Sequence, residues 1–144
     1  VIMSGLFETK AGIISDLNFL LQIIVIIVLF AGVNYGKDKT QGGLKKHGRI
    51  MTIAVVLNAV GFLFVMGPSI FSYFSVPFVE LSAFGVVSTS LHAVFGGIAE
   101  IFGIAFALNK KPRNIRFWMR LTRWLWVVAF LLGVSLYLQV AGLI

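Results

Sequence analysis

The stretch LNFLLQIIVIIVLFAGVNYGKDK, residues 17–39, decides the fold of this chain. Residues 17–36 carry no charge, and Lys37 and Lys39 follow directly. A helix needs about 20 mostly apolar residues to cross a hydrocarbon core of about 30 Å. Because irregular backbone cannot face lipid, this stretch predicts a membrane-spanning helix that ends at the basic residues.

Three further uncharged stretches follow, at residues 50–79, 81–99 and 124–144. Each is long enough to hold another spanning helix. The sequence therefore predicts an all-α fold, an integral membrane four-helix bundle that forms a single transmembrane domain over residues 1–144, with residues 1–15 as a short outside segment. We expect its helices near residues 17–36, 50–72, 86–108 and 117–141.

The composition of the whole chain agrees with a lipid environment. Of its 144 residues, 59% are hydrophobic and 12% are charged, whereas soluble domains have about 45–50% apolar and about 25% charged residues. So few charges cannot cover a water-exposed surface, which excludes a cytosolic enzyme and a nucleic-acid-binding domain. The absence of cysteine excludes a disulfide scaffold and a thiolate site.

Nearly all basic residues lie in two short segments between the apolar stretches. Eleven of the twelve Lys and Arg residues follow the first or the third expected helix. Short loops rich in Lys and Arg stay in the cytoplasm, so we expect both segments there, and both termini and residues 73–85 outside a plasma membrane. The residues that set this orientation, and that can also contact lipid headgroups, are Lys37, Lys39, Lys45, Lys46, Arg49, Lys110, Lys111, Arg113, Arg116 and Arg120.

Local signals refine the expected helices. The first apolar stretch lacks the basic start and the cleavage site of a signal peptide, so we expect it to stay in the protein. Asp16 or Ser15 can cap that helix, Pro68 is expected to kink the second, and Pro77 suits the lead into the third. The start of the fourth helix has tryptophans that fit an aromatic interface belt, namely Trp118, Trp124 and Trp126.

The third expected helix carries a histidine above a stripe of small residues. His92, Gly96, Ala99 and Gly103 share one narrow face, and Ala107 continues the small-residue spacing. Such a stripe lets a neighbouring helix approach closely, which favours a packing face with a hydrogen-bonded histidine. The alternative is a pocket for a flat cofactor such as haem b, with His92 as the iron ligand.

A depth count tests which residues can share a haem with His92. His47 lies at the inner boundary, whereas His92 lies sixteen residues above Leu108, or about 24 Å higher at 1.5 Å per residue. One chain therefore cannot form a bis-histidine site from these two residues. Met66 lies sixteen residues above Ile50, level with His92, so a His92/Met66 pair is geometrically possible.

Glu100 is the one carboxylate expected deep in the membrane, about 12 Å above the inner boundary by the same count. An ionisable residue at that depth is a functional candidate. Arg123 enters the membrane on the adjacent expected helix, and Asn58 lies near the same level. We expect a structural ion pair between Glu100 and Arg123; the alternative is a proton relay through Glu100.

Several short motifs resemble the small bacterial and archaeal membrane proteins of domain-of-unknown-function family 420. Similar features are Leu17-Asn18, the spacing from Gly32 to Lys37, a histidine before the second helix, Leu57-Asn58, His92, and Leu136-Tyr137-Leu138. The similarity spans about residues 17–140. Family members usually carry further histidines where this chain has Met66-Gly67-Pro68 and residues 114–116. The resemblance implies a four-helix membrane protein associated with haem-copper terminal oxidases.

These observations lead to one expected function and two open alternatives. We expect an accessory subunit without catalytic activity of its own, in a membrane-bound oxidoreductase complex such as a terminal oxidase or a copper-dependent membrane monooxygenase. Its partners would be membrane lipids and other integral membrane subunits, without nucleic acid, cofactor or metal. The alternatives are a haem-b-binding or haem/metal-assembly protein that uses His92, and a small proton-conducting protein or transporter that uses Glu100.

The expected orientation can be tested by cysteine labelling, because the chain has no cysteine of its own. A Lys45→Cys variant is expected to react with a membrane-impermeant maleimide only from the cytoplasmic side, since it lies in a basic segment. A Ser75→Cys variant is expected to react only from outside. The reverse labelling pattern would overturn the orientation.

Overall fold

The computed structural model describes residues 6–7, 11–75, 83–110 and 112–144, and every regular element in these ranges is helical. Four stretches are long and apolar enough to cross a membrane, at Gly12–Tyr35, Gln41–Phe71, Phe84–Ala107 and Ile115–Val140. The prediction of an all-α, multi-pass membrane four-helix bundle is confirmed. Its elements are α1 (Gly12–Tyr35), α2 (Gln41–Gly61), η1 (Phe62–Met66), α3 (Gly67–Ser75), α4 (Ala83–Ala107) and α5 (Ile115–Val140).

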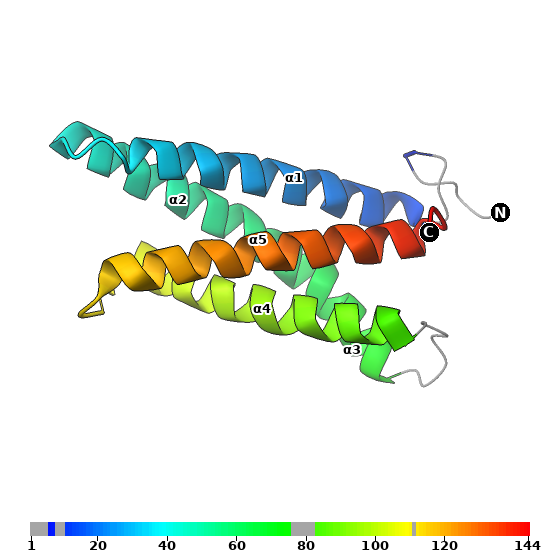
Figure 1. Ribbon diagram of the computed structural model, residues 1–144. Coiled ribbons are helices and arrows are strands. Elements are labelled where there is room, and N and C mark those ends of the chain that lie inside the picture. The colour runs from blue at the N-terminus through cyan, green and yellow to red at the C-terminus, as the bar shows by residue number, and fades with distance from the viewer. Residues whose placement is uncertain (1–5, 8–10, 76–82, 111) are drawn as a thin grey trace.

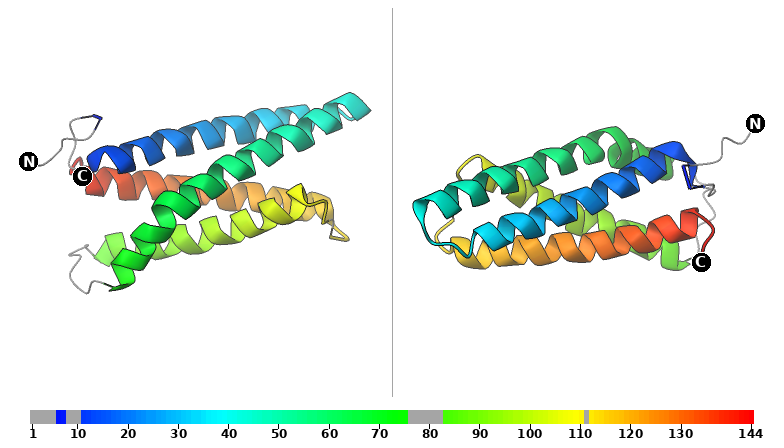
Figure 2. Two further views of the ribbon diagram at one scale, coloured as in Figure 1. Left: turned by 180° about the vertical axis from the view of Figure 1, so that it is seen from behind. Right: turned by 90° about the horizontal axis from the view of Figure 1, so that it is seen from above.

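The helices form two antiparallel hairpins that lie side by side (Figure 1). α1 packs along α2, and α4 packs along α5. Figure 2 shows α2 crossing the back of the bundle, from the end of α1 toward α4. The α1–α2 and α4–α5 connections therefore lie at one end, called the basic end below, opposite α3. The buried core lies between the helices and consists of Leu29, Ala54, Val55, Ala99 and Trp126.

The second span is one continuous helix with a π turn just before Pro68. The N–H of Gly67 donates to the carbonyl of Phe62, five residues back, instead of four. Pro68 has no N–H, and its ring clashes with the carbonyl four residues back in a regular α-helix. The wider turn makes room for that ring, while Oγ of Ser69 donates to the carbonyl of Val65 at 2.7 Å. A local change of helix type thus takes the place of a break at Pro68.

The expected starts of the first two helices are wrong, because α1 continues past Asp16 and α2 past Arg49 toward their N-termini. α1 begins at Gly12 rather than residue 17, so it includes part of the segment expected outside. α2 begins at Gln41 rather than residue 50, because Oγ1 of Thr40 accepts the N–H of Gly43 at 3.1 Å and caps a polar first turn. The N–H of Thr40 in turn donates to Asp38, and this bond holds the pKa of Asp38 below its ordinary value.

The sequence predicts that Asp16 or Ser15 caps α1, but Asp16 instead lies within the helix and is buried. No side chain caps the start of α1. Asp16 is 0% exposed and accepts the hydroxyl of Tyr137 at 2.7 Å and the N–H of Phe7 at 3.3 Å. The Tyr137 ring stacks on Phe19 with 4.1 Å between centroids. These contacts join the start of α1 to the end of α5. Pro77, which we expect to lead into the third helix, lies outside the described residues.

His47 joins α2 to α1 through a contact that we call a histidine clasp. Its Nδ1 donates to the carbonyl of Gly32 at 2.7 Å. A Cβ at Gly36, one turn later at the C-cap of α1, would lie 2.9 Å from the same nitrogen. A histidine clasp is thus a ring that rests on a glycine and donates to the backbone carbonyl one turn before it. Only a residue without a side chain leaves the ring this path to the carbonyl.

The histidine clasp predicts that two glycines respond in opposite ways to the same change. Gly36→Ala is expected to destabilise the protein by about 1–3 kcal/mol, because the new methyl group displaces the His47 ring. Gly48→Ala is the matched control, since no atom lies within 4 Å of its Cβ position in α2. It is expected to stabilise by about 0.5–1 kcal/mol through helix propensity. Thermal unfolding in one detergent measures both, and equal effects would contradict the clasp.

Candidate functional site

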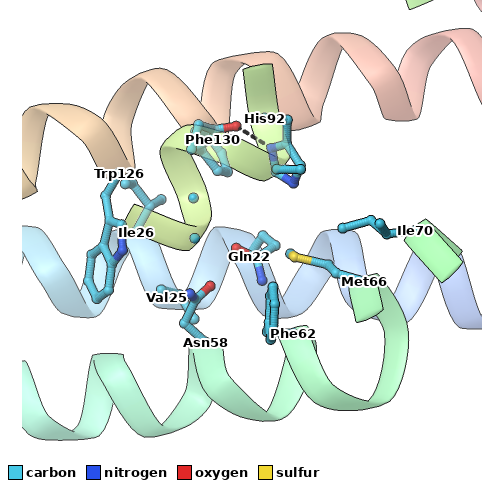
Figure 3. A pocket seen from close by; sticks show the side chains of 14 residues that line it. Gln22, Val25, Ile26, Asn58, Phe62, Met66, Ile70, His92, Trp126 and Phe130 are labelled. Atoms are coloured by element: carbon cyan, nitrogen blue, oxygen red, sulfur yellow. Dashed lines mark hydrogen bonds between the residues drawn. The ribbon is translucent and has the colours of Figure 1, made fainter. Parts of the chain in front are cut away.

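A small cavity lies near the middle of the bundle, where α1, the second span, α4 and α5 meet. Its volume is about 40 Å³. Figure 3 shows side chains from all four spans around it. Its polar lining comes from Gln22 on α1, Asn58 on α2, His92 on α4 and Trp126 on α5. The remaining lining residues are Val25, Ile26, Phe62, Met66, Ile70, Ala93, Gly96, Gly97, Ala129 and Phe130.

His92 forms a second histidine clasp, between α4 and α5. Its Nδ1 donates to the carbonyl of Ala129 at 2.7 Å (dashed in Figure 3). A Cβ at Gly133, one turn later, would lie 2.9 Å from Cε1 of the ring. Because a carbonyl only accepts, Nδ1 carries the hydrogen, and in a neutral ring Nε2 then has the lone pair. His92 is therefore held by one nitrogen and offers the other as an acceptor beside the cavity.

Met66 lines the same cavity as His92, so the two residues that the depth count placed at one level do meet in one site. Met66 belongs to the π turn η1. A thioether and an imidazole Nε2 are both possible iron ligands. A volume of 40 Å³ is nevertheless far below the about 300–1,000 Å³ of pockets that hold drug-sized ligands. With the helices packed as they are, the cavity accommodates water-sized molecules and not a porphyrin.

Glu100 does not line the cavity, but it neighbours two residues that do, Gly96 on α4 and Asn58 on α2. It follows Gly96 by one turn on α4 and is 6% exposed. Its Oε2 accepts Nδ2 of Asn58 at 2.7 Å. Its other oxygen, Oε1, is buried without a hydrogen-bond partner among the described residues. Glu100 is thus held from α2 by a neutral amide.

The expected ion pair between Glu100 and Arg123 is not formed. Arg123 lies instead over the ring of Trp124, with 5.6 Å from its guanidinium carbon to the ring centroid. Its long side chain can keep the guanidinium charge near the basic end. Moving that charge beside Glu100 would require its desolvation. Asn58 reaches Glu100 from a helix that packs against α4. The choice of partner follows from which faces of α2 and α5 are turned toward α4.

The small residues of α4 lie against two different helices. Gly96 faces Ala129 of α5, with 3.7 Å from its Cβ position to the alanine methyl carbon. Gly103 would place a Cβ 2.9 Å from Val55 of α2 and 3.5 Å from Trp126 of α5. Ala99 between them is completely buried, whereas Ala107 is half-buried. α4 is therefore packed closely on two sides around the level of Glu100.

The basic residues expected at lipid headgroups lie apart from the cavity, at the basic end. Lys46 lies 5.8 Å from the ring centroid of Tyr35. Lys111 is outside the described residues. The other members of the expected set are exposed, namely Lys37, Lys39, Lys45, Arg49, Lys110, Arg113, Arg116 and Arg120.

Sequence reasoning missed several groups that shape the site. Trp126 was assigned to an interface belt, yet it is 7% exposed and lines the cavity, whereas Trp124 is 59% exposed. Gln22 was not noticed, although a glutamine inside an apolar span is a signal for an interior polar contact. The glycine partners of the histidine clasps had a signal too, because Gly36 and Gly133 each follow a small residue by four positions.

Comparisons with known proteins add no relative. No family model, no curated protein and no solved structure matches this chain. The resemblance to family 420 therefore stays a prediction.

The geometry around Glu100 predicts energetic coupling to Asn58 and not to Arg123. Asn58→Leu is expected to destabilise the protein by about 1–3 kcal/mol, because it leaves a buried oxygen of Glu100 without its donor. The same change in a Glu100→Leu background is expected to cost much less, since both polar groups are then gone. Unfolding in mixed detergent micelles measures this double-mutant cycle.

A second, matched double-mutant cycle tests Arg123 in place of Asn58 as the partner of Glu100. It measures Arg123→Gln in the native and in the Glu100→Leu background. We expect a coupling free energy close to zero, because the guanidinium leans on Trp124. A larger coupling to Arg123 than to Asn58 would restore the ion pair.

Proposed function

We propose that this chain is an accessory subunit, without catalytic activity of its own, of a membrane-bound oxidoreductase complex. The observation that carries this proposal is the use of its histidines. His47 and His92 both donate to backbone carbonyls of neighbouring helices. Histidine is a common catalytic base and metal ligand, and here both rings hold helical hairpins together. The most reactive side chains of the chain thus serve its assembly.

The outer faces of the bundle support a role embedded among lipids and other membrane helices. Large apolar side chains are exposed on every span, for example Ile27 of α1, Phe64 of the second span, Ile101 of α4 and Leu131 of α5. In a membrane such faces suit lipid tails and the apolar faces of partner subunits equally. This surface favours a protein that works by contact within the bilayer.

The oxidoreductase part of the proposal rests on the family resemblance, which points to terminal oxidases, with a copper-dependent membrane monooxygenase as the other candidate complex. The proposed location is the plasma membrane with the basic end in the cytoplasm. It is supported by both basic connections lying at the same end of the bundle and by the preference of Lys/Arg-rich loops for the cytoplasm.

The proposal of haem b binding at His92 is less favoured. A free Nε2 and the nearby Met66 support it. The 40 Å³ cavity opposes it, because a porphyrin would have to push α4 away from the second span.

Purification from native membranes in mild detergent tests the proposed function. The tagged chain is expected to co-purify in fixed stoichiometry with integral membrane subunits that carry the spectrum and activity of an oxidoreductase. A His92→Leu variant is expected to leave that visible spectrum unchanged and to loosen the association, because it removes one histidine clasp.

His47→Leu is the matched control, since it removes the other clasp far from the cavity. Similar effects of the two variants on association would support a structural role. A Soret band in the chain purified alone, lost in His92→Leu and kept in His47→Leu, would overturn the proposal in favour of haem binding.

A further inference from the structure

Two residues that line the cavity, and one that is hydrogen-bonded to a lining residue, carry buried polar atoms without partners. Among the described residues they include Oε1 of Glu100, Nε1 of Trp126 and Nε2 of Gln22. Glu100 and Trp126 are both more than nine-tenths buried. The middle of a bilayer offers no water to bond to such groups, so leaving them unsatisfied is costly. Unpartnered polar groups in and next to the lining therefore point to a small polar ligand in the cavity.

The donors and acceptors around the cavity complement one another through water. Trp126 and Gln22 offer N–H donors, whereas Nε2 of a neutral His92 ring offers an acceptor lone pair. Oε1 of Glu100 needs a partner in either protonation state. A water molecule both donates and accepts, and a buried water typically makes about three hydrogen bonds. The volume of 40 Å³ exceeds the about 10–15 Å³ that one water requires.

The Trp126 indole connects the cavity with the level of Glu100. It lines the cavity, and its Cζ2 packs on Gly103, three residues beyond Glu100 on α4. Asn58 also lines the cavity while its amide holds Oε2 of Glu100. The Glu100 carboxyl group is therefore hydrogen-bonded to a side chain that itself lines the cavity.

We propose that the cavity holds a water cluster and that Glu100 exchanges a proton with it, which makes this site a proton-binding site inside the membrane. The proton leaves Oε1 for a water oxygen, and that water passes one of its own protons to the next. At each transfer one O–H bond breaks and one forms, so the net change is a carboxylate at Glu100 and one excess proton on the water cluster. His92 anchors the far end of the cluster as a hydrogen-bond acceptor. This site is independent of the complex in which the chain works.

Few charged or titratable groups face Glu100 from the helices packed on α4. On α5 the nearest is Arg123, which leans on Trp124. On α2 the facing group is Asn58, while His47 lies eleven residues, or about three turns, toward the basic end in the first clasp. On α4 itself His92 lies two turns away. α1 also lines the cavity, and its carboxyl group, Asp16, lies far from Glu100 at the opposite end of the bundle, where it accepts the hydroxyl of Tyr137.

Infrared spectroscopy of the full chain in lipid vesicles tests the proton on Glu100. The native protein is expected to show the carbonyl stretch of a protonated carboxylic acid that shifts in D2O. Glu100→Gln is expected to remove this band. Asp16→Asn is the control, because it changes the other buried carboxyl group and is expected to leave the Glu100 band in place. The absence of any Glu100-dependent band between acidic and alkaline pH would overturn the proposal.

Filling the cavity tests the water route with Glu100 intact. Gly97 lines the cavity, and no atom lies within 4 Å of its Cβ position. Gly97→Leu is expected to displace water from the cavity. It is expected to slow hydrogen–deuterium exchange of the Glu100 carboxyl group by about tenfold or more, as measured by rapid mixing with D2O. Gly48→Leu is the matched control at another open glycine and is expected to change nothing. Equal exchange rates in both variants would exclude the cavity as the proton's route.

Discussion

Both hairpins of this bundle depend on the histidine clasp. Inside a bilayer the hydrophobic effect does not drive helices together, so close packing and hydrogen bonds must hold them. His47 and His92 combine the two, since each ring rests on a glycine and bonds the carbonyl one turn before it. The glycine is required because a side chain there would separate the ring from the carbonyl. The rest of the interior is arranged around these two fixed contacts.

The second clasp also determines what the cavity can do. With Nδ1 committed to Ala129, His92 turns its accepting nitrogen toward the cavity. The π turn before Pro68 adds to this arrangement, because it helps keep Phe62, Met66 and Ile70 on the cavity side of a long helix. Two features that look like packing details thus produce one small site with polar groups from every span.

The two buried carboxyl groups share a further property, since each accepts a hydrogen bond from a neutral side chain. Tyr137 donates to Asp16 near one end, and Asn58 donates to Glu100 near the middle. At Glu100 the neutral donor satisfies one oxygen of the carboxyl group without bringing a second charge into lipid. The arginines can then stay near the basic end, where their flexible side chains reach polar surroundings.

The sequence by itself determined the four spans, the common end of the two basic segments and the common level of His92 and Met66. Hydropathy and charge are read directly from the residue types, and depth follows from counting residues at a fixed rise per residue. None of the three needs tertiary information. Only the tertiary structure decided that Glu100 binds Asn58 rather than Arg123, and that Trp126 is buried while Trp124 is exposed. These outcomes depend on how each helix is rotated about its axis and where it crosses its neighbours. Rotation and crossing are set by side chains from distant segments packing together, as at Gly36 and Gly133, which a count along one helix does not contain.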